Sequence, residues 1–352
     1  MTAPTLERDV AIGPLGLDCG VTLQNVVQRV SVYGTPRPDG GNVVLVAHAL
    51  TGSSRVLDWW GGLAGPGKLL DTDAVAVVCV NALGSCYGST GPGSIAPSGA
   101  PYGERFPLVT VPDIVRAQRE ALAQIGLTRF AAVVGGSLGG MQALAWALEA
   151  PAQVDRALVI GAYDHFAAMG IALNAIARDA IRIARTPAEG IALARKIAML
   201  TYKSEALLSR RFARNHDRNG GDPTRISTDR YDVEGYLDHQ GVIFAARMEP
   251  LAYLALTRAM DLFDTRDIAL APPHPQLTFV GISSDWLFLP SYVREAAERF
   301  ARDGADSRYL ELVSDHGHDA FLAEPERLYA LLRPRLESLY ASLAREGSRV
   351  RR

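Results

Sequence analysis

The sequence contains little cysteine. Only Cys19, Cys79 and Cys86 occur in 352 residues, and no two of them form a C-x-x-C pair. An odd number of widely spaced thiols argues against a disulfide framework and against a thiolate metal site. We therefore expect free thiols and a cytoplasmic location.

Long apolar runs and an excess of one charge are also absent. No stretch approaches the roughly 18 consecutive apolar residues of a membrane-spanning helix, and Glu7, Arg8 and Asp9 lie where a signal peptide would be apolar. The 36 basic and 38 acidic residues are mixed along the chain and give a net charge of -2. We expect small-molecule substrates, and neither nucleic acid nor membrane, as partners.

Apolar runs rich in β-branched residues are present instead, and they are typical of strands that are covered on both faces. Helical patterns such as Val111–Ile125 and Gly139–Ala150 lie between some of them. This alternation predicts an α/β fold with a doubly wound, mostly parallel sheet. The strand-like runs are Asn42–His48, Ala74–Val80, Phe130–Val134, Ala157–Ile160 and Leu277–Gly281.

The alternation stops between about Ala162 and Leu270, where the chain becomes helical, for example over Ile191–Ser204 and Tyr253–Phe263. A helical insertion between two strands of one sheet explains this change. We predict a core domain formed by residues 1–161 and 271–352, and a helical lid over residues 162–270. The polar, turn-rich segment Asn215–Thr228 predicts a mobile loop within the lid.

The sharpest motif is Gly135-Gly136-Ser137-Leu138-Gly139-Gly140, a G-x-S-x-G sequence between a buried strand and a helix. A serine hydroxyl becomes a nucleophile when a tight turn holds it exposed beside a base, and glycines give the room for that turn. Ser137 is therefore the candidate nucleophile. Its glycine spacing does not match G-x-G-x-x-G, and the P-loop-like run that ends at Lys68 has Leu69 where Ser or Thr would bind magnesium, so a nucleotide site is not expected.

A nucleophilic serine needs a base and an orienting acid, which in α/β-hydrolases follow it in the order acid, then histidine. Asp285 follows the strand-like run that ends at Gly281, and it is the candidate acid. His316 and His318 lie further on in one loop, and the spacing does not choose between them. No further ligands with metal-site spacing lie nearby, so we expect no metal.

A tetrahedral oxyanion requires two backbone N–H donors, one after the nucleophile and one in the loop after an early strand. Leu138 supplies the first. We assign the second to Leu50, in the loop His48-Ala49-Leu50-Thr51-Gly52.

Many motifs in order, over about residues 42–322, resemble the homoserine O-acetyltransferase family of α/β-hydrolases. They include His48-Ala49-Leu50-Thr51-Gly52, Trp59-Trp60-Gly61, Cys86-Tyr87-Gly88-Ser89-Thr90-Gly91-Pro92, Gly135 to Gln142, Tyr236-Leu237-Asp238-His239-Gln240-Gly241, Ser284-Asp285-Trp286-Leu287 and Gly317-His318-Asp319-Ala320-Phe321-Leu322. The resemblance implies a ping-pong reaction in which Ser137 takes an acyl group from acyl-CoA and passes it to the hydroxyl of homoserine. It also implies a homodimer. No cofactor is implied, since acyl-CoA is a substrate.

The resemblance selects His318 as the base. It further implies that Thr51, Arg195, Tyr202 and Asp319 bind the amino-acid substrate. A guanidinium can hold the substrate's carboxylate and a carboxylate can balance its ammonium. Arg195 and Tyr202 are seven residues apart, so they share one face of a helix.

The chain departs from the family pattern after about residue 181, where it passes directly to Thr186-Pro187-Ala188-Glu189-Gly190 and so predicts a shortened lid. Ser85 also replaces a frequent glycine. Because the lid and the pocket rim select substrates, serine as acceptor and succinyl-CoA as donor remain open. Hydrolysis by an esterase, and a binding protein without activity, are the alternatives from other classes.

Overall fold

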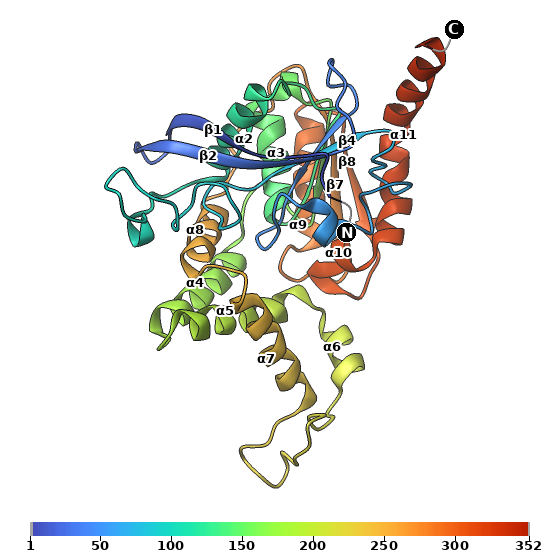
Figure 1. Cartoon of the computed structure of the whole chain (residues 1–352). Helices are drawn as coiled ribbons and strands as arrows, with labels where there is room; N and C mark the ends of the chain where they lie inside the picture. Colours follow the sequence, from blue (N-terminus) through green and yellow to red (C-terminus); the bar gives the residue numbers. More distant parts are fainter. Residues whose placement is uncertain (1–2, 351–352) are drawn as a thin grey trace.

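The computed structural model describes residues 3–350, with side chains described up to residue 345. The chain forms one eight-stranded sheet in the order β1-β2-β4-β3-β5-β6-β7-β8 (Figure 1). β1 and β2 form an antiparallel hairpin, and β2 is antiparallel to β4. The remaining neighbours are parallel. The strands are β1 Leu6–Gly16, β2 Thr22–Tyr33, β3 Val43–Ala47, β4 Ala76–Val80, β5 Ala132–Gly136, β6 Arg156–Ile160, β7 Gln276–Ile282 and β8 Ser307–Leu312.

The central strands are buried on both faces, and alternate residues enter two different cores. Val43 and Leu45 of β3 pack into one core, whereas Val44 and Val46 pack into the other. Successive side chains of a strand point to opposite faces, so a strand covered on both sides must be apolar throughout. This confirms the mostly parallel, doubly wound sheet that the apolar runs predicted.

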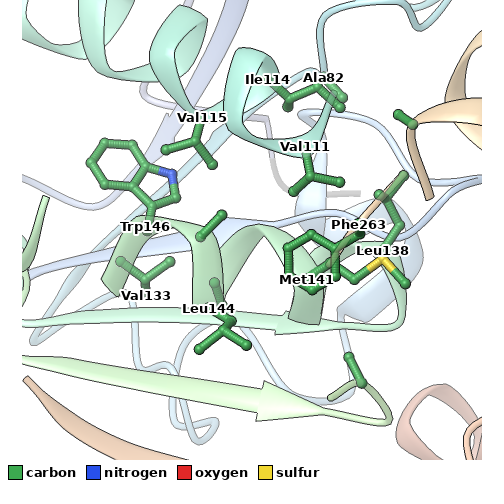
Figure 2. Close-up of a cluster of buried hydrophobic side chains, with 14 of the residues drawn as sticks. Ala82, Val111, Ile114, Val115, Val133, Leu138, Met141, Leu144, Trp146 and Phe263 are labelled. Carbon is green, nitrogen blue, oxygen red and sulfur yellow. The ribbon is translucent and has the colours of Figure 1, made fainter. Parts of the chain in front are cut away.

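Helices cover both faces of the sheet. The first core contains residues of α2 Val111–Gln124, α3 Leu138–Glu149 and α9 Pro290–Arg302. The second contains residues of α1 Val56–Trp60, α10 Ala320–Ala323 and α11 Pro325–Val350. In the first core, Val111 and Val115 of α2 lie opposite Met141 and Trp146 of α3 (Figure 2). This packing fixes the position of α3, the helix that follows Ser137.

The helical insertion lies between β6 and β7 in the chain. It contains α4 Ala168–Ile183, α5 Pro187–Tyr202, α6 Glu205–Phe212, α7 Asp232–Ala245 and α8 Pro250–Asp261. Figure 1 shows these helices together on one side of the sheet, with a long loop between α6 and α7. The described helices include none with the length and apolarity that a bilayer crossing requires.

Several predicted boundaries differ from the structure. The expected helix Tyr253–Phe263 corresponds to α8, which begins at Pro250 and ends at Asp261. The expected helix Ile191–Ser204 ends at Tyr202, because the Ser204 side chain instead caps α6 by accepting a hydrogen bond from the Leu207 N–H at 3.1 Å. The expected strand Phe130–Val134 is shifted, since β5 runs over Ala132–Gly136. The strand therefore continues up to the residue before Ser137.

Candidate active site

Ser137 occupies a strained turn between β5 and α3. Its φ of 59° lies in the left-handed region, which is costly for a residue with a Cβ. The turn is held by the Ser137 N–H, which donates to the Ile160 carbonyl at 2.9 Å, and by the Ser137 carbonyl, which accepts from the Met141 N–H at 3.0 Å. Its side chain caps no helical N–H group. The hydroxyl therefore lies at the start of α3 but does not cap the helix.

Glycines around Ser137 are required by close backbone contacts. A Cβ at Gly139 would lie 2.1 Å from the Ala47 carbonyl oxygen, and a Cβ at Gly135 would lie 2.1 Å from the Gly139 carbonyl oxygen. A Cβ at Gly136 would lie 2.5 Å from the Phe321 ring. The turn forms only because these positions lack side chains.

Asp285 and His318 meet at the carboxyl ends of β7 and β8. His318 Nδ1 donates to Asp285 Oδ2 at 2.6 Å. The other oxygen of Asp285 accepts from the N–H groups of Leu287 and Phe288, both at 2.9 Å. Three donors around one buried carboxylate satisfy its oxygens and fix its orientation. The structure thus pairs Asp285 with His318 and not with His316.

The environment of His318 suits a base. Burial, the largest single influence, disfavours the charged imidazolium, but the charge and hydrogen bond of Asp285 outweigh it and raise the pKa of His318. The ring stacks on Phe288, with ring centres 4.9 Å apart. Its Nε2 is buried and has no hydrogen-bond partner among the described residues. Since Nδ1 carries the proton donated to Asp285, Nε2 is left with a free lone pair.

The two expected oxyanion donors are both available. Leu50 and Leu138 are buried, and within the described chain neither backbone N–H donates a hydrogen bond. Leu138 is the first residue of α3, where no acceptor exists within the helix. Two free N–H groups near a nucleophile are the usual elements of an oxyanion hole.

A pocket beneath the inserted helices contains Ser137 and Leu50. Its other walls come mainly from α4, α5 and α8 and are mostly apolar. They are formed by Phe166, Leu173, Asn174, Ala177, Ile197, Ala198, Thr201, Tyr202, Tyr253, Met260 and Leu287. The inserted helices therefore roof the nucleophile with mostly apolar side chains.

Arg195 and Tyr202 lie together on one face of α5, as their spacing predicted. The Arg195 guanidinium lies 5.5 Å from the centre of the Tyr202 ring and 5.0 Å from that of Phe244. Burial raises the pKa of Tyr202 to about 12, so its hydroxyl keeps its proton. Arg195 makes no ion pair with any described residue, and its Nε is buried without a hydrogen-bond partner. An unneutralised cation beside the pocket can attract a carboxylate.

Asp319, the expected partner of the substrate's ammonium, is already paired. Its carboxylate lies 2.8 Å from Lys203 Nζ, and both side chains are mostly buried. Thr51 is not part of the pocket wall, although its carbonyl accepts from Arg247 Nη1 at 2.8 Å. The structure thus places Ser137, Leu50 and Tyr202 at the pocket, Arg195 against Tyr202, and Thr51 against Arg247.

Sequence reasoning missed Lys203 and the apolar pocket wall. Lys203 directly follows Tyr202, but the sequence gives no sign that it pairs with a residue 116 positions later. Among the described residues, no group of three or more His, Cys, Asp or Glu side chains is arranged to hold a metal ion.

Comparison with known proteins agrees with this geometry. Residues 42–325 match the model of the α/β-hydrolase fold family. The chain is 40% identical to the homoserine O-acetyltransferase of Acidiphilium cryptum, over 88% of this chain and 89% of that protein. It is 38% identical to the homoserine O-succinyltransferase of Bordetella pertussis, over 95% of this chain and 88% of that protein. The chain belongs to the α/β-hydrolase family and, within it, to the homoserine O-acyltransferases.

A solved structure supports the fold. The crystal structure of homoserine O-acetyltransferase from Bacillus anthracis aligns with a TM-score of 0.85 at 22% identity, covering 97% of this chain and 98% of that one. At this identity the likeness shows the fold alone. The expected fold is therefore confirmed.

Proposed function

We propose that this protein transfers an acetyl group from acetyl-CoA to the hydroxyl of L-homoserine, a step toward methionine. The observation that carries the proposal is the buried Asp285–His318 hydrogen bond at 2.6 Å, in a chain whose Ser137 is held in a strained turn at the head of α3. Family membership and the unpaired Arg195 in the roof point to an amino acid as the acceptor.

In the first half-reaction, Ser137 becomes acylated. His318 Nε2 takes the hydroxyl proton while Ser137 Oγ attacks the carbonyl carbon of the thioester. The N–H groups of Leu50 and Leu138 stabilise the resulting oxyanion. The C–S bond then breaks, and the thiolate leaves as CoA-SH with the proton from His318.

In the second half-reaction, the acceptor hydroxyl gives its proton to His318 Nε2 and attacks the acyl carbon. The C–Oγ bond breaks, and His318 returns the proton to Ser137. Transfer rather than hydrolysis requires that water stays out while the acceptor binds. We assign this task to residues 162–270, which act as a lid whose α4, α5 and α8 line the pocket over Ser137.

The acceptor would be held by charge and by fit. Arg195 has no ion-pair partner in the described chain and would bind the carboxylate, assisted by Tyr202. The ammonium would displace Lys203 from Asp319 and bind to the Asp319 carboxylate. Thr51, within the oxyanion loop, would also contact the acceptor. Acyl-CoA is a substrate here, and we propose that no metal or resident cofactor takes part.

A succinyl donor is the second candidate, because the Bordetella pertussis relative, named a homoserine O-succinyltransferase, is almost as similar as the acetyltransferases. A matrix of two donors, acetyl-CoA and succinyl-CoA, against homoserine, serine and water separates the possibilities by thiol release. We expect CoA release with acetyl-CoA to depend on homoserine. Equal release with water alone would identify an esterase, and turnover only with another pair would replace the acceptor or the donor.

We also propose a homodimer that forms through the lid. Met169, Ile176 and Ile183 follow one another at seven-residue intervals on α4, and each is more than half exposed. Residues at this spacing form one stripe on a helix, and exposed apolar stripes mark interaction surfaces. A cytoplasmic location is consistent with the three free cysteines.

A further inference from the structure

A chain of buried polar side chains leads through α2 and α3 to the proposed oxyanion hole. Trp146, Gln118 and Gln142 form this chain, and each is at most 1% exposed. Trp146 Nε1 donates to Gln118 Oε1 at 2.8 Å, and Gln118 Nε2 donates to Gln142 Oε1 at 2.8 Å. Figure 2 shows Trp146 and Leu138 near opposite ends of α3. Burying polar groups this deep in an apolar core costs free energy unless they are hydrogen-bonded, so their mutual hydrogen bonds hold them in one arrangement.

Trp146 fixes the orientation of both glutamine amides in this series of hydrogen bonds. An indole N–H can only donate, so the oxygen of Gln118 must face Trp146 and its nitrogen must face Gln142. The oxygen of Gln142 is then occupied, and its nitrogen must point away from Gln118. A glutamine held in this way cannot flip its amide without leaving two buried groups unpaired.

The nitrogen of Gln142 bridges the two halves of the oxyanion hole. It donates to the His48 carbonyl at 3.1 Å and to the Leu138 carbonyl at 3.3 Å. His48 begins the loop that carries Leu50, and Leu138 is itself the other donor residue. One side-chain amide therefore spans elements that are 90 residues apart in sequence.

His48 holds the Leu50 peptide from the other side. The Ala49 carbonyl can only accept and the Ala82 N–H can only donate, so His48 Nδ1 donates to the former at 2.8 Å and Nε2 accepts from the latter at 2.9 Å. Burial lowers the pKa of His48 to about 4, which keeps this arrangement neutral. The Ala49 carbonyl and the Leu50 N–H belong to one planar peptide, so fixing the oxygen also aims the N–H.

We propose that Gln142 is a positioning residue that sets the separation and direction of the Leu50 and Leu138 N–H groups, with Gln118 and Trp146 as its supports. Catalysis by an oxyanion hole depends on donors that are already in place when charge develops. The inference rests on the proposed acylation of Ser137, but not on the identity of the donor or the acceptor.

The test measures the acylation of Ser137 by p-nitrophenyl acetate in Gln142→Met, which keeps the side-chain length and removes the amide. We expect kcat to fall about 10- to 100-fold while KM stays within about twofold, because the lost interactions act in the transition state. Gln118→Met, which leaves Gln142 in place but unoriented, should give a smaller decrease in kcat. It keeps the inference testable if Gln142→Met does not fold.

Met141→Leu is the matched control, since Met141 is fully buried on the same helix and its side chain lies in the apolar core. It should retain the wild-type kcat. The inference is wrong if kcat of a folded Gln142→Met or Gln118→Met equals that of Met141→Leu, or if KM rises at constant kcat. A wild-type enzyme that reacts with the ester but never acylates homoserine would contradict the proposed function and leave this inference intact.

Discussion

At the scale of single residues, the site depends on the balance of two opposing effects on His318. Burial favours the neutral ring, and Asp285 favours the charged ring. Because the carboxylate prevails, it would stabilise the imidazolium that forms in the proposed proton transfer. Asp285 itself gains three donors, so its orientation does not depend on His318 alone.

This balance predicts the pH dependence of acylation. The pKa of His318 is raised above its ordinary value of 6.5, so kcat/KM should fall as the pH decreases through a value above 6.5, where the base becomes protonated. Asp285→Asn removes the charge and weakens the hydrogen bond that raise this pKa, and leaves only the smaller effect of Asp319 against burial. The acid limb should therefore move to lower pH, and the rate should fall by about 10⁴-fold. An unchanged acid limb in Asp285→Asn would contradict the assignment of His318.

Arg195 gives a second prediction at this scale. Arg195→Met should raise KM for homoserine about tenfold or more, because the carboxylate loses its cation, while the burst of Ser137 acylation stays intact. Arg211→Met is the control, since Arg211 is another lid arginine that lies over an aromatic ring, that of Tyr236, at 4.9 Å. If both variants change KM equally, general loss of lid charge and not a specific clamp is responsible.

Ser137 and Asp285 could be predicted from sequence because their local context is a strand followed by a turn. The choice of His318 over His316 required the family pattern, since both lie in one loop. Lys203 and Gln142 could not be predicted, because Asp319 and His48, which they contact, are distant in sequence and are brought beside them only by the fold. Pairings of this kind leave no local pattern.

At the scale of elements, the strand-to-helix turn is the least tolerant part of the fold. Gly139→Ala would place a Cβ 2.1 Å from the Ala47 carbonyl oxygen, and both elements are buried. We expect it to reduce the free energy of unfolding by about 3 kcal/mol or more in urea titrations. Gly16→Ala, whose Cβ meets no atom within 4 Å, should have little effect. Equal stability of the two variants would show that the turn can relax.

The strands β3 to β7 could be predicted because burial on both faces makes them continuously apolar. The hairpin of β1 and β2 was not predicted, since most of β1 is exposed and its residues carry no apolar run. The inserted helices α5 and α8 were predicted in part. The predicted end of α5 was wrong because Ser204 caps α6 instead of continuing α5. Exposure of β1 therefore explains the missed hairpin, and capping by Ser204 explains the wrong end of α5.

At the scale of the whole molecule, the lid has two proposed surfaces: an inner one over Ser137 and an outer apolar one on α4. Ile176→Glu should convert the dimer to monomer in analytical ultracentrifugation, because the charge would be buried at the contact. Ile95→Glu is the control, since Ile95 is similarly exposed but lies outside the lid. A wild-type monomer, or a dimer that persists in Ile176→Glu, would remove this surface from the account.

The central claim is that the acyl group passes through Ser137 to an amino-acid hydroxyl. Peptide mass spectrometry after mixing the protein with acetyl-CoA tests it most directly. We predict an acetyl group on the peptide that contains Ser137, and its loss on adding L-homoserine together with the appearance of O-acetylhomoserine. An unlabelled Ser137 during homoserine-dependent turnover, or a label that water removes as fast as homoserine does, would contradict the account.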